Sequence, residues 1–341
     1  MLPLASLWQR GAARSAAPLI LEVPASQVSA ELAALDPSQT LVRQGPFDVV
    51  LARASQIPAL MLEIGRVREE TFRHAGEGTG KRYDLDRFDE HYEHLALWDR
   101  VHGRVAGSCR LASTADTLAR MGRAGLYTTT LFHLGAAFFR AIGPAVELGR
   151  SFVHPAYQRK PHSLLLLWRG IGRYLELRPE CRALFGPVSI SGTYTLQGRQ
   201  MIARFLAERA AADEPLRRCA RARRPLRQPW PQPWLGRGNA LPRAASLEEA
   251  DELLRLIGGP EAKRGMPVLL RQYLKLGGQV VCCSVDPAFN HCLDALVVLD
   301  LRIADHARLI RMLGFDPSGD AVKRGPQSRA AGGDDCAIRP V

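Results

Sequence analysis

Hydrophobic positions in the first third of the chain switch between the spacing of strands and that of helices. Residues 47–52 predict a short strand, and the apolar side chains from 57 to 71 recur every three or four residues, which predicts an amphipathic helix. Two further apolar runs, 94–98 and 104–111, flank a turn that contains Gly103. We therefore expect an antiparallel hairpin after the first helix.

Similar patterns continue to about residue 315. Residues 145–153 predict a strand, 162–175 predict an amphipathic helix, and Ser246 followed by Glu249 predicts a capped helix start. The remaining elements are helical segments at 117–120, 131–139 and 197–210, and strands at 183–190, 279–285 and 293–301. Strands interspersed with helices indicate an α/β (α+β) fold with a mixed central β-sheet flanked by helices.

Composition divides the chain into five segments. An extension rich in alanine, serine and proline, 1–44, is expected to be flexible and precedes a structured core, 45–212. Arginine, proline and tryptophan dominate 213–245, which excludes a regular helix or a central strand there and predicts a linker. Regular patterning resumes in 246–315. The tail, 316–341, is rich in glycine, aspartate and arginine and is expected to be disordered.

The overall composition is that of an ordinary globular protein. Hydrophobic residues are 46% and charged residues 23%, which excludes a disordered or fibrous chain. The formal net charge is +12, yet only five of the 46 basic residues are lysine. Such a charge attracts an anionic partner, namely nucleic acid, a lipid surface or an acidic protein, unless the arginine bias reflects codon composition. No apolar run approaches the roughly 18 residues that span a bilayer.

Cysteine usage and the linker narrow the possible partners. Seven scattered cysteines give an odd number, so a reducing cytoplasm is the simpler inference. Cys282, Cys283 and Cys292 lie near His291, but their spacing is not that of a zinc site, and no metal is expected. The linker mixes arginine with tryptophan, which suits single-stranded nucleic acid. No recognition module accompanies it, so no nucleic-acid partner is expected.

Three aspartates follow the first helix within six residues: Asp84, Asp86 and Asp89. Their spacing allows three carboxylates to converge on one cation, such as the ammonium group of a substrate. The alternative is a solvated acidic turn that Lys81, Arg82 and Arg87 balance, and spacing alone favours this alternative.

A second polar feature interrupts the strand at 145–153. Glu147 lies among apolar residues, and a buried carboxylate is costly without a partner. Arg150 would lie on the opposite strand face, unless a bulge at Gly149 brings both side chains together. A buried glutamate with a raised pKa suits a general base, although a neighbouring arginine would lower that pKa again.

The run from Val67 to Val153 resembles the GNAT-fold N-acyltransferases that use an acyl carrier protein. Two branches are similar: the ornithine and amino-acid lipid N-acyltransferases (hemolysin-like family) and the acyl-homoserine-lactone synthases. The resemblance rests on Arg68, Phe72, Tyr83–Asp86, Phe88–Asp89, His94–Leu95, Gly107–Leu111 and Glu147–Val153. Beyond Val153 only the lipid branch is similar, through residues 167–172, 185–191, 267–278, 285–289 and 293–301.

The resemblance implies a GNAT-like sheet and a reaction. A (3-hydroxy) fatty acyl group would pass from acyl carrier protein to the α-amine of a small amino acid such as ornithine or glycine, the first step of aminolipid biosynthesis. Glu147 would be the base, and Arg150 would join it as a catalytic residue. The residues expected to bind the acceptor are Arg68, Phe72, Asp84, Asp86, Asp89, Arg110 and Ser151. No permanently bound cofactor is expected, and acyl-[acyl carrier protein] is the co-substrate.

The donor expectation also rests on a departure from related enzymes. GNAT enzymes that use acetyl-CoA carry a glycine-containing loop that binds the pyrophosphate at a helix N-terminus. The equivalent stretch, 158–163, has no glycine, which argues against free CoA. Arg159 and Lys160, with the arginine-rich linker, are expected to dock the acidic carrier protein.

The resemblance makes 45–212 and 246–315 two parts of one acyltransferase. Three alternatives remain open: an acyl-homoserine-lactone-type signal synthase, a basic nucleic-acid-binding protein, and a GNAT domain with only a structural role. We expect a cytoplasmic protein, and peripheral contact with an anionic inner membrane remains open as well.

Overall fold

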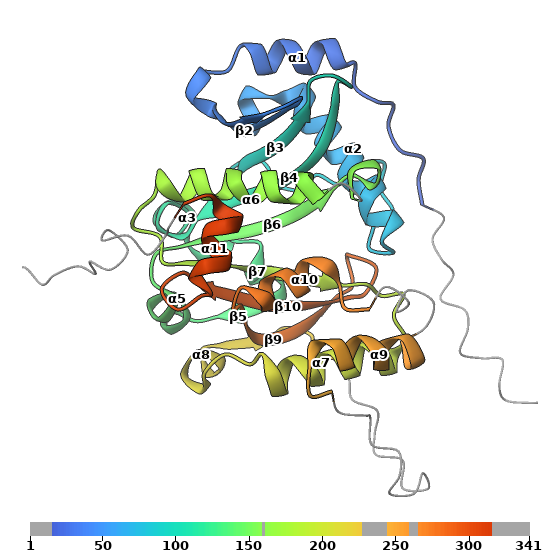
Figure 1. Cartoon of the computed structure of the whole chain (residues 1–341), viewed down its shortest axis with the longest axis vertical. Coiled ribbons are helices and arrows are strands. Elements are labelled where there is room, and N and C mark those ends of the chain that lie inside the picture. The colour runs from blue at the N-terminus through green and yellow to red at the C-terminus, as the bar shows by residue number, and fades with distance from the viewer. Residues whose placement is uncertain (1–15, 159–160, 227–243, 259–264, 316–341) are drawn as a thin grey trace, which may run out of the picture.

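An eight-stranded mixed sheet forms the centre of the molecule (Figure 1). The computed structural model describes residues 16–158, 161–226, 244–258 and 265–315. The strand order is β1-β2-β3-β4-β6-β7-β10-β9. Its strands are β1 (Thr40–Gln44), β2 (Phe47–Arg53), β3 (Glu93–Asp99), β4 (Arg104–Ser113), β6 (Ala145–Val153), β7 (Ala183–Ile190), β9 (Gln279–Asp286) and β10 (Cys292–Asp300). A separate two-stranded sheet joins β5 (Phe132–Leu134) to β8 (Ala220–Ala222).

One parallel pair interrupts the otherwise antiparallel central sheet. β6 and β7 run parallel and pair only from Ala145 opposite Ala183 to Glu147 opposite Phe185. The other neighbouring strands of this sheet are antiparallel. Beyond Glu147 the two strands no longer pair, so the hydrogen-bond ladder opens in the middle of the sheet.

Helices cover both faces of this sheet (Figure 1). They are α1 (Ala25–Ala33), α2 (Pro58–His74), α3 (Thr114–Met121), α4 (Thr128–Leu131), α5 (Ala136–Ile142), α6 (Pro161–Glu176), α7 (Leu196–Arg209), α8 (Glu214–Arg218), α9 (Leu247–Ile257), α10 (Val268–Lys275) and α11 (His306–Leu313). None of the described helices is long and apolar enough to cross a membrane.

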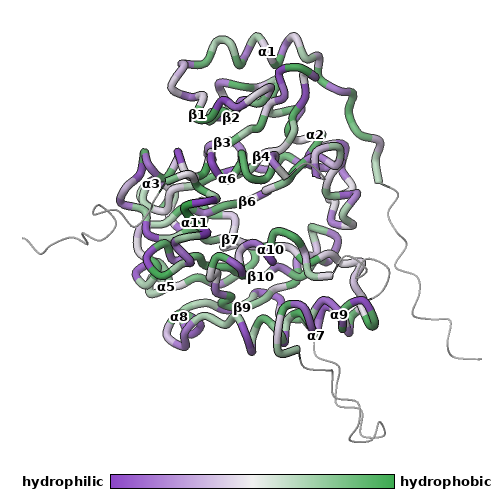
Figure 2. Tube along the Cα trace, viewed as in Figure 1, coloured by the Kyte–Doolittle hydropathy of each residue, from purple (hydrophilic) through white to green (hydrophobic). Residues whose placement is uncertain are grey.

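The alternation of side chains along the strands places the two largest helices on opposite faces. Val49 and Leu95 belong to the core that α6 completes. Val50 and Ala96, their chain neighbours, belong to the core under α2. Successive strand residues point to opposite faces, so α6 and α2 sandwich the sheet. At the molecule's edge, hydrophilic and hydrophobic residues alternate along α7 and α9, as expected of helices with one buried face (Figure 2).

Most predicted elements of the core are confirmed within a few residues. The first strand and helix, the hairpin, and the elements expected at 145–153, 162–175, 183–190 and 197–210 all form. The helix after Ser246 also forms, and the Ser246 hydroxyl accepts a hydrogen bond from the backbone N–H of Glu249. The mixed sheet flanked by helices confirms the expected fold class.

Three expectations are wrong in part, in each case because tertiary contacts override a weak local signal. The extension 1–44 contains α1 and β1; Val28 packs into the core under α2, and β1 pairs with β2. The segment 131–139 is not one helix, because β5 pairs with β8 before α5 begins. The segment 213–245 contains α8 and β8 before residue 227. Residues 227–243, and the tail 316–341, lie outside the described residues.

Candidate functional site

The opening between β6 and β7 forms a cleft. β6 contributes Leu148 to Ser151, and β7 contributes Gly186 to Ser189. The other lining residues come from elements on either side of these strands: Phe72, Tyr127, Leu269, Tyr273, Phe289 and Asp294. The cavity measures about 50 Å³. This is room for one or two water molecules or a small polar group, since one water in the liquid takes roughly 30 Å³.

A β-bulge re-aims β6 at this cleft. Gly149 lies opposite Arg110 of β4 and Phe152 lies opposite Ser108, so two residues of β6 face one residue of β4. Arg150, within the bulge, has a φ of 49°, which is uncommon for a residue with a side chain. A bulge at Gly149 is one of two alternatives that the sequence leaves open, and the structure places a bulge one residue later. The bulge turns Arg150 toward the acidic loop before β3.

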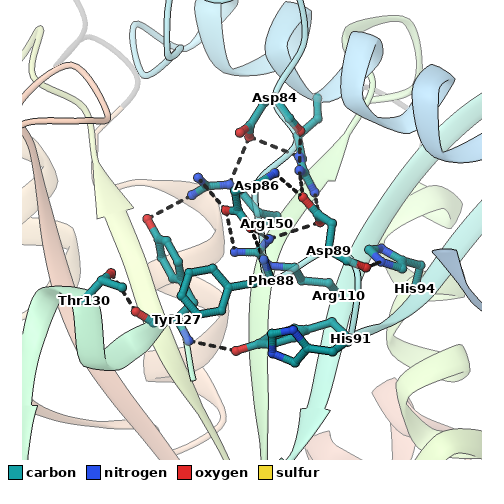
Figure 3. A network of polar contacts seen from close by, with 12 residues as sticks. Asp84, Asp86, Phe88, Asp89, His91, His94, Arg110, Tyr127, Thr130 and Arg150 are labelled. Atoms are coloured by element: carbon teal, nitrogen blue, oxygen red, sulfur yellow. Dashed lines mark hydrogen bonds and ion pairs between the residues drawn. The ribbon is translucent and has the colours of Figure 1, made fainter. Parts of the chain in front are cut away.

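Six of the predicted acceptor-binding or catalytic residues form one ionic network (Figure 3). Arg68 of α2 is buried and contacts both neighbouring aspartates: Nε lies 3.0 Å from Asp84 Oδ2, and Nη2 donates to Asp89 Oδ2 at 2.8 Å. A second bond, from Nη1 to Asp89 Oδ1 at 3.1 Å, makes the contact with Asp89 bidentate. The arginine therefore fixes the loop to the helix.

The other two arginines extend the network from the sheet. Arg110 donates to Asp86 Oδ1 at 2.7 Å and to Asp89 Oδ1 at 3.1 Å. Arg150 Nε lies 3.0 Å from Asp84 Oδ2, and its Nη2 lies 3.5 Å from Asp86 Oδ2. Three cations and three carboxylates thus alternate with no formal excess charge. Asp86 is the most exposed member, with 24% of its side chain accessible.

The network changes the pKa values of its carboxyls. Burial alone would raise the pKa of Asp89, but the guanidinium groups of Arg68 and Arg110 hold it well below its usual range. Burial also opposes ionisation of Asp86, and Arg110 again lowers the pKa below the ordinary value. These aspartates therefore stay ionised at neutral pH and do not act as proton acceptors. The solvated acidic turn that spacing favoured is wrong, because Asp84 and Asp89 are buried.

Glu147 is fully buried and has three hydrogen-bond donors. The Tyr92 hydroxyl donates to Oε2 at 2.6 Å, and the Thr128 amide and hydroxyl donate to Oε1 at 2.6 and 2.5 Å. Burial raises the pKa of Glu147, against the lowering effect of these donors. The Tyr92 hydroxyl also accepts a bond from the Tyr127 amide. Glu147 therefore holds the segment that carries Tyr127, and it is not among the residues that line the cleft.

The remaining predicted residues divide into two groups. Phe72 lines the cleft and packs edge-on against Phe289, with ring centroids 4.9 Å apart. Ser151 lies in the bulge and also lines the cleft. Arg159 and Lys160, expected to dock a carrier protein, lie outside the described residues.

Sequence reasoning missed several polar residues at the cleft. Tyr127 donates to Asp286 Oδ2 at 3.1 Å and accepts from Arg150 at 3.1 Å. Glu77, buried, accepts a bond from the Ser189 hydroxyl at 2.7 Å. Asp294 of β10 lines the cleft directly. An aspartate inside the apolar strand at 293–301 is the same signal that singled out Glu147, so Asp294 could have been found.

A second hollow is strongly basic. It is an open groove of about 1040 Å³ along β5, β8 and residues of the segment 123–130 that precedes β5. Six exposed arginines line it: Arg87, Arg123, Arg218, Arg221, Arg223 and Arg224. No described acidic residue lines it. Tyr127 borders the cleft and Thr129 and Thr130 border the groove, so α4 and its preceding residue separate the two sites.

Metal ligation has no candidate in the part of the chain that the structure describes. No group of three or more histidine, cysteine, aspartate or glutamate side chains there is arranged to hold an ion. The aspartates of the ionic network are fully occupied by arginine.

Two curated proteins are similar to this chain over about half of their length. Glycine N(alpha)-acyltransferase of Bacteroides thetaiotaomicron is 38% identical over 162 residues, which are 44% of this chain and 48% of that protein. Glycine N(alpha)-acyltransferase of Phocaeicola vulgatus is 36% identical over 160 residues, which are 44% and 49% of the two chains.

A solved structure of a CoA-dependent acyl-homoserine lactone synthase, MesI, is also similar. It covers 78% of this chain and 94% of its own chain, with 11% identity and a TM-score of 0.35. The synthase LasI covers 47% of this chain and 78% of its own, with 15% identity and a TM-score of 0.30. TM-scores this low do not define a common fold.

A family model matches part of the chain. The model described as "Acetyltransferase (GNAT) domain" matches residues 67–169, the stretch that contains the second half of α2, the acidic loop, β3, β4 and β6. These elements carry every member of the ionic network and one wall of the cleft. The resemblance to GNAT-fold acyltransferases that the sequence analysis noted is thereby confirmed for this part of the chain, where residues 67–169 match the GNAT domain model.

Proposed function

We propose that this protein transfers an acyl group from a thioester to the α-amine of a small amino acid, with glycine as the first candidate acceptor. The observation that carries the proposal is the cleft where β6 and β7 separate, within reach of a pre-organised set of charged residues. The names of the two curated relatives support an α-amine acceptor.

The charged residues suit the two ends of an amino acid. Arg150 is the one cationic side chain among the described residues that line the cleft, and it is a suitable partner for the acceptor's carboxylate. Its guanidinium group also lies over the rings of Tyr127 and Phe289, at 4.8 Å from each centroid. Both rings and the bond to Asp84 restrict its motion, so little side-chain entropy is lost when the acceptor binds.

The open ladder suits the acyl thioester. Attack of an amine on a thioester carbonyl forms an oxyanion, which needs fixed donors. Beyond Glu147, the backbone N–H groups of β6 that face β7 have no strand partner on β7. We propose that one of them binds the thioester oxygen, as a pre-organised donor that requires no side chain.

The surroundings of Glu147 in the structure do not suit the general base expected from the sequence. Its carboxylate already accepts three hydrogen bonds and does not line the cleft. We propose that Glu147 positions Tyr127 through Tyr92 and Thr128. In this proposal it is not the general base of the reaction. Glu147→Gln is then expected to lower kcat/KM without removing the pH dependence that an essential base produces.

The basic groove suits an acidic carrier of the acyl group. Six arginines without a carboxylate among the described lining create a positive potential beside the cleft. Acyl carrier protein remains our proposed donor, and a (3-hydroxy) fatty acyl group its proposed cargo. A protein that meets the donor beside this groove needs no glycine-rich pyrophosphate loop.

A matrix of donors and acceptors tests the proposal. Purified protein is incubated with acyl-[acyl carrier protein] or acyl-CoA, and with glycine, ornithine, serine or homoserine, and products are identified by mass spectrometry. We expect N-acylglycine, formed faster from the carrier-protein donor. Faster reaction with ornithine would revise the acceptor, and the absence of any N-acyl amino acid would refute the proposed activity.

A further inference from the structure

Asp294 occupies an unusual place in β10. Asp294 shares one face of β10 with Leu296 and Val298, which both belong to an apolar core. Asp294 lies opposite Ser189 of β7 and Ser284 of β9, at the point where that face reaches the cleft. The residue is 5% exposed, so its carboxyl is almost entirely withdrawn from bulk water while it borders the cavity.

One oxygen of this carboxyl has no partner. Asp294 Oδ2 accepts no hydrogen bond from any described residue, and no described cation forms an ion pair with Asp294. The nearby acids are satisfied: Asp286 accepts from Tyr127 and from the Ala288 amide, and Glu77 accepts from Ser189. A buried carboxyl that lacks a partner costs free energy unless a ligand supplies one.

The charges around Asp294 favour a cation. Its neighbours Glu77 and Asp286 are also acids, and the cation whose charge acts on it, Arg150, is already engaged with Asp84 and Asp86. A small positive group in the cleft would therefore meet the free carboxyl oxygen of Asp294, the one acidic side chain in the described lining. The arginine at the other side would meet an anionic group of the same ligand.

We propose that Asp294 binds the ammonium group of the amino-acid acceptor and takes its proton, so that the free amine can attack the thioester. This inference rests on the proposed function and assigns its base. Arg150 and Asp294, both in the lining of the cleft, then receive the two ends of one zwitterion.

The step balances as follows. The ammonium nitrogen gives one proton to the Asp294 carboxylate, and the resulting amine attacks the thioester carbonyl carbon to form a C–N bond. When the C–S bond breaks, the thiolate leaves with the electron pair and takes the second proton from nitrogen. The products are an amide and a thiol, and the proton on Asp294 passes to solvent.

The titratable behaviour of the cluster agrees with this role. Burial, with Asp286 and Glu77, raises the pKa of Asp294, and Arg150 lowers it. An ammonium group would supply the missing positive charge and favour the ionised carboxylate. The titratable and charged groups that act on Asp294 or are acted on by it are Glu77, Tyr127, Arg150, Cys283, Asp286 and Cys292.

Acceptor binding without a donor tests the ammonium site independently of catalysis. Isothermal titration of the wild-type protein compares glycine with glycolate, which has a hydroxyl in place of the amine. We expect glycine to bind at least tenfold more tightly, and Asp294→Asn to remove most of this difference. Equal affinities of the wild-type protein for the two ligands would overturn the proposal even if the variant does not fold.

Steady-state rates test the proton transfer. Asp294→Asn is expected to lower kcat/KM for glycine by about 100-fold or more, the size typical of a lost general base. With aminooxyacetate, whose weakly basic amine is already neutral at pH 7, the same variant should lose less than tenfold in kcat/KM. Asp300→Asn, at the opposite end of β10 and away from the cleft, is the matched control and should retain wild-type rates.

The outcomes separate the two proposals. Equal losses of kcat/KM for glycine and aminooxyacetate would overturn the proton-transfer role of Asp294. An Asp294→Asn variant with unchanged binding and rates would overturn both ammonium binding and proton transfer. A wild-type protein that selects glycine over glycolate but forms no amide would leave the ammonium site standing and refute the proposed acyl transfer.

Discussion

Arg68 and Arg43 both bind aspartate, but in different surroundings. The Arg68 side chain is 1% exposed and bridges two carboxylates, whereas that of Arg43 is 64% exposed and binds Asp48. Removal of a buried partner leaves uncompensated charge in a medium that solvates it poorly. The difference in burial therefore decides what each arginine contributes to stability.

Arg68→Met should lower the free energy of unfolding by about 3 kcal/mol or more, the range for breaking a buried pair. Arg43→Met, the exposed control, should change it by less than about 1 kcal/mol. Denaturant unfolding followed by circular dichroism measures both. Similar small changes in the two variants would show that Arg68 does not hold the acidic loop.

Glu77 makes stability depend on pH. Burial raises its pKa from 4.5 to about 7, against the lowering effect of the Ser189 hydrogen bond. Because the folded state holds the proton more tightly than the unfolded state, the stabilisation is fully present below pH 4.5. It is lost as the pH rises through about 7.

Glu77→Gln should therefore match the wild-type stability near pH 4.5 and exceed it at pH 8 by up to about 3 kcal/mol. His94, whose pKa burial lowers from 6.5 to about 4, changes stability in the opposite direction over an overlapping pH range. It is present in both proteins and cancels in their difference. A difference that stays flat from pH 4.5 to 8 would contradict the account.

At the residue scale, the sequence identifies charged residues that lie in apolar strands or in clusters, but it does not predict which ion pairs they form. Glu147 was identifiable because it interrupts an apolar strand, and the aspartates of the loop because they cluster. Which arginine satisfies which aspartate depends on the approach of α2, β4 and β6. Glu77 lies in a glycine-rich loop, where nothing local indicates its burial.

At the element scale, the close approach of β6 and β7 at the start of the cleft depends on a glycine. A Cβ at Gly186 would lie 2.2 Å from the carbonyl oxygen of Leu148, far inside van der Waals contact. Any side chain there would push β7 away from β6 at the start of the cleft. Glycine at position 186 is therefore required for the spacing of β6 and β7 where the cleft begins, and not for a backbone turn.

Gly186→Ala should lower the thermal midpoint, with a cost of about 1–3 kcal/mol typical of overpacking, and reduce kcat/KM by at least tenfold. Gly135→Ala is the control, since a Cβ there meets no atom closer than 3.9 Å. Thermal unfolding and initial rates measure both variants. Wild-type behaviour of Gly186→Ala would mean that the strands can shift without consequence.

Elements with strong periodicity could be predicted from the sequence, whereas elements that depend on distant partners could not. α6 and β6 bury apolar faces that are visible in the sequence. β5 and β8 are three residues each and form because they pair with one another across almost 90 residues. The bulge at Arg150 likewise follows from the register with β4, so sequence placed it only approximately.

At the scale of the whole molecule, the positive charge is concentrated where a partner could use it. The ionic network compensates its own charges, whereas of the six arginines of the basic groove Arg218 alone forms an ion pair with a carboxylate, that of Glu214, among the described residues. The net charge of +12 alone could not distinguish a functional surface from codon bias. The pairing of β5 with β8 brings arginines from distant segments into one groove.

Reversal of two groove charges tests the donor proposal. Arg221→Glu with Arg224→Glu should lower kcat/KM for acyl-[acyl carrier protein] by at least tenfold at low ionic strength, and less at high salt. The rate with acyl-CoA should change less than threefold. Arg255→Glu, on the exposed side of α9, is the matched control. Equal effects on both donors would contradict a docking role.

The most direct test of the central claim locates the bond that the protein forms. The wild-type protein is given acyl-[acyl carrier protein] and glycine labelled with 15N, and the product is fragmented by mass spectrometry. The account predicts an amide between the acyl carbonyl and the labelled α-nitrogen, formed in proportion to enzyme. Free fatty acid without labelled amide, at every enzyme concentration, would contradict it.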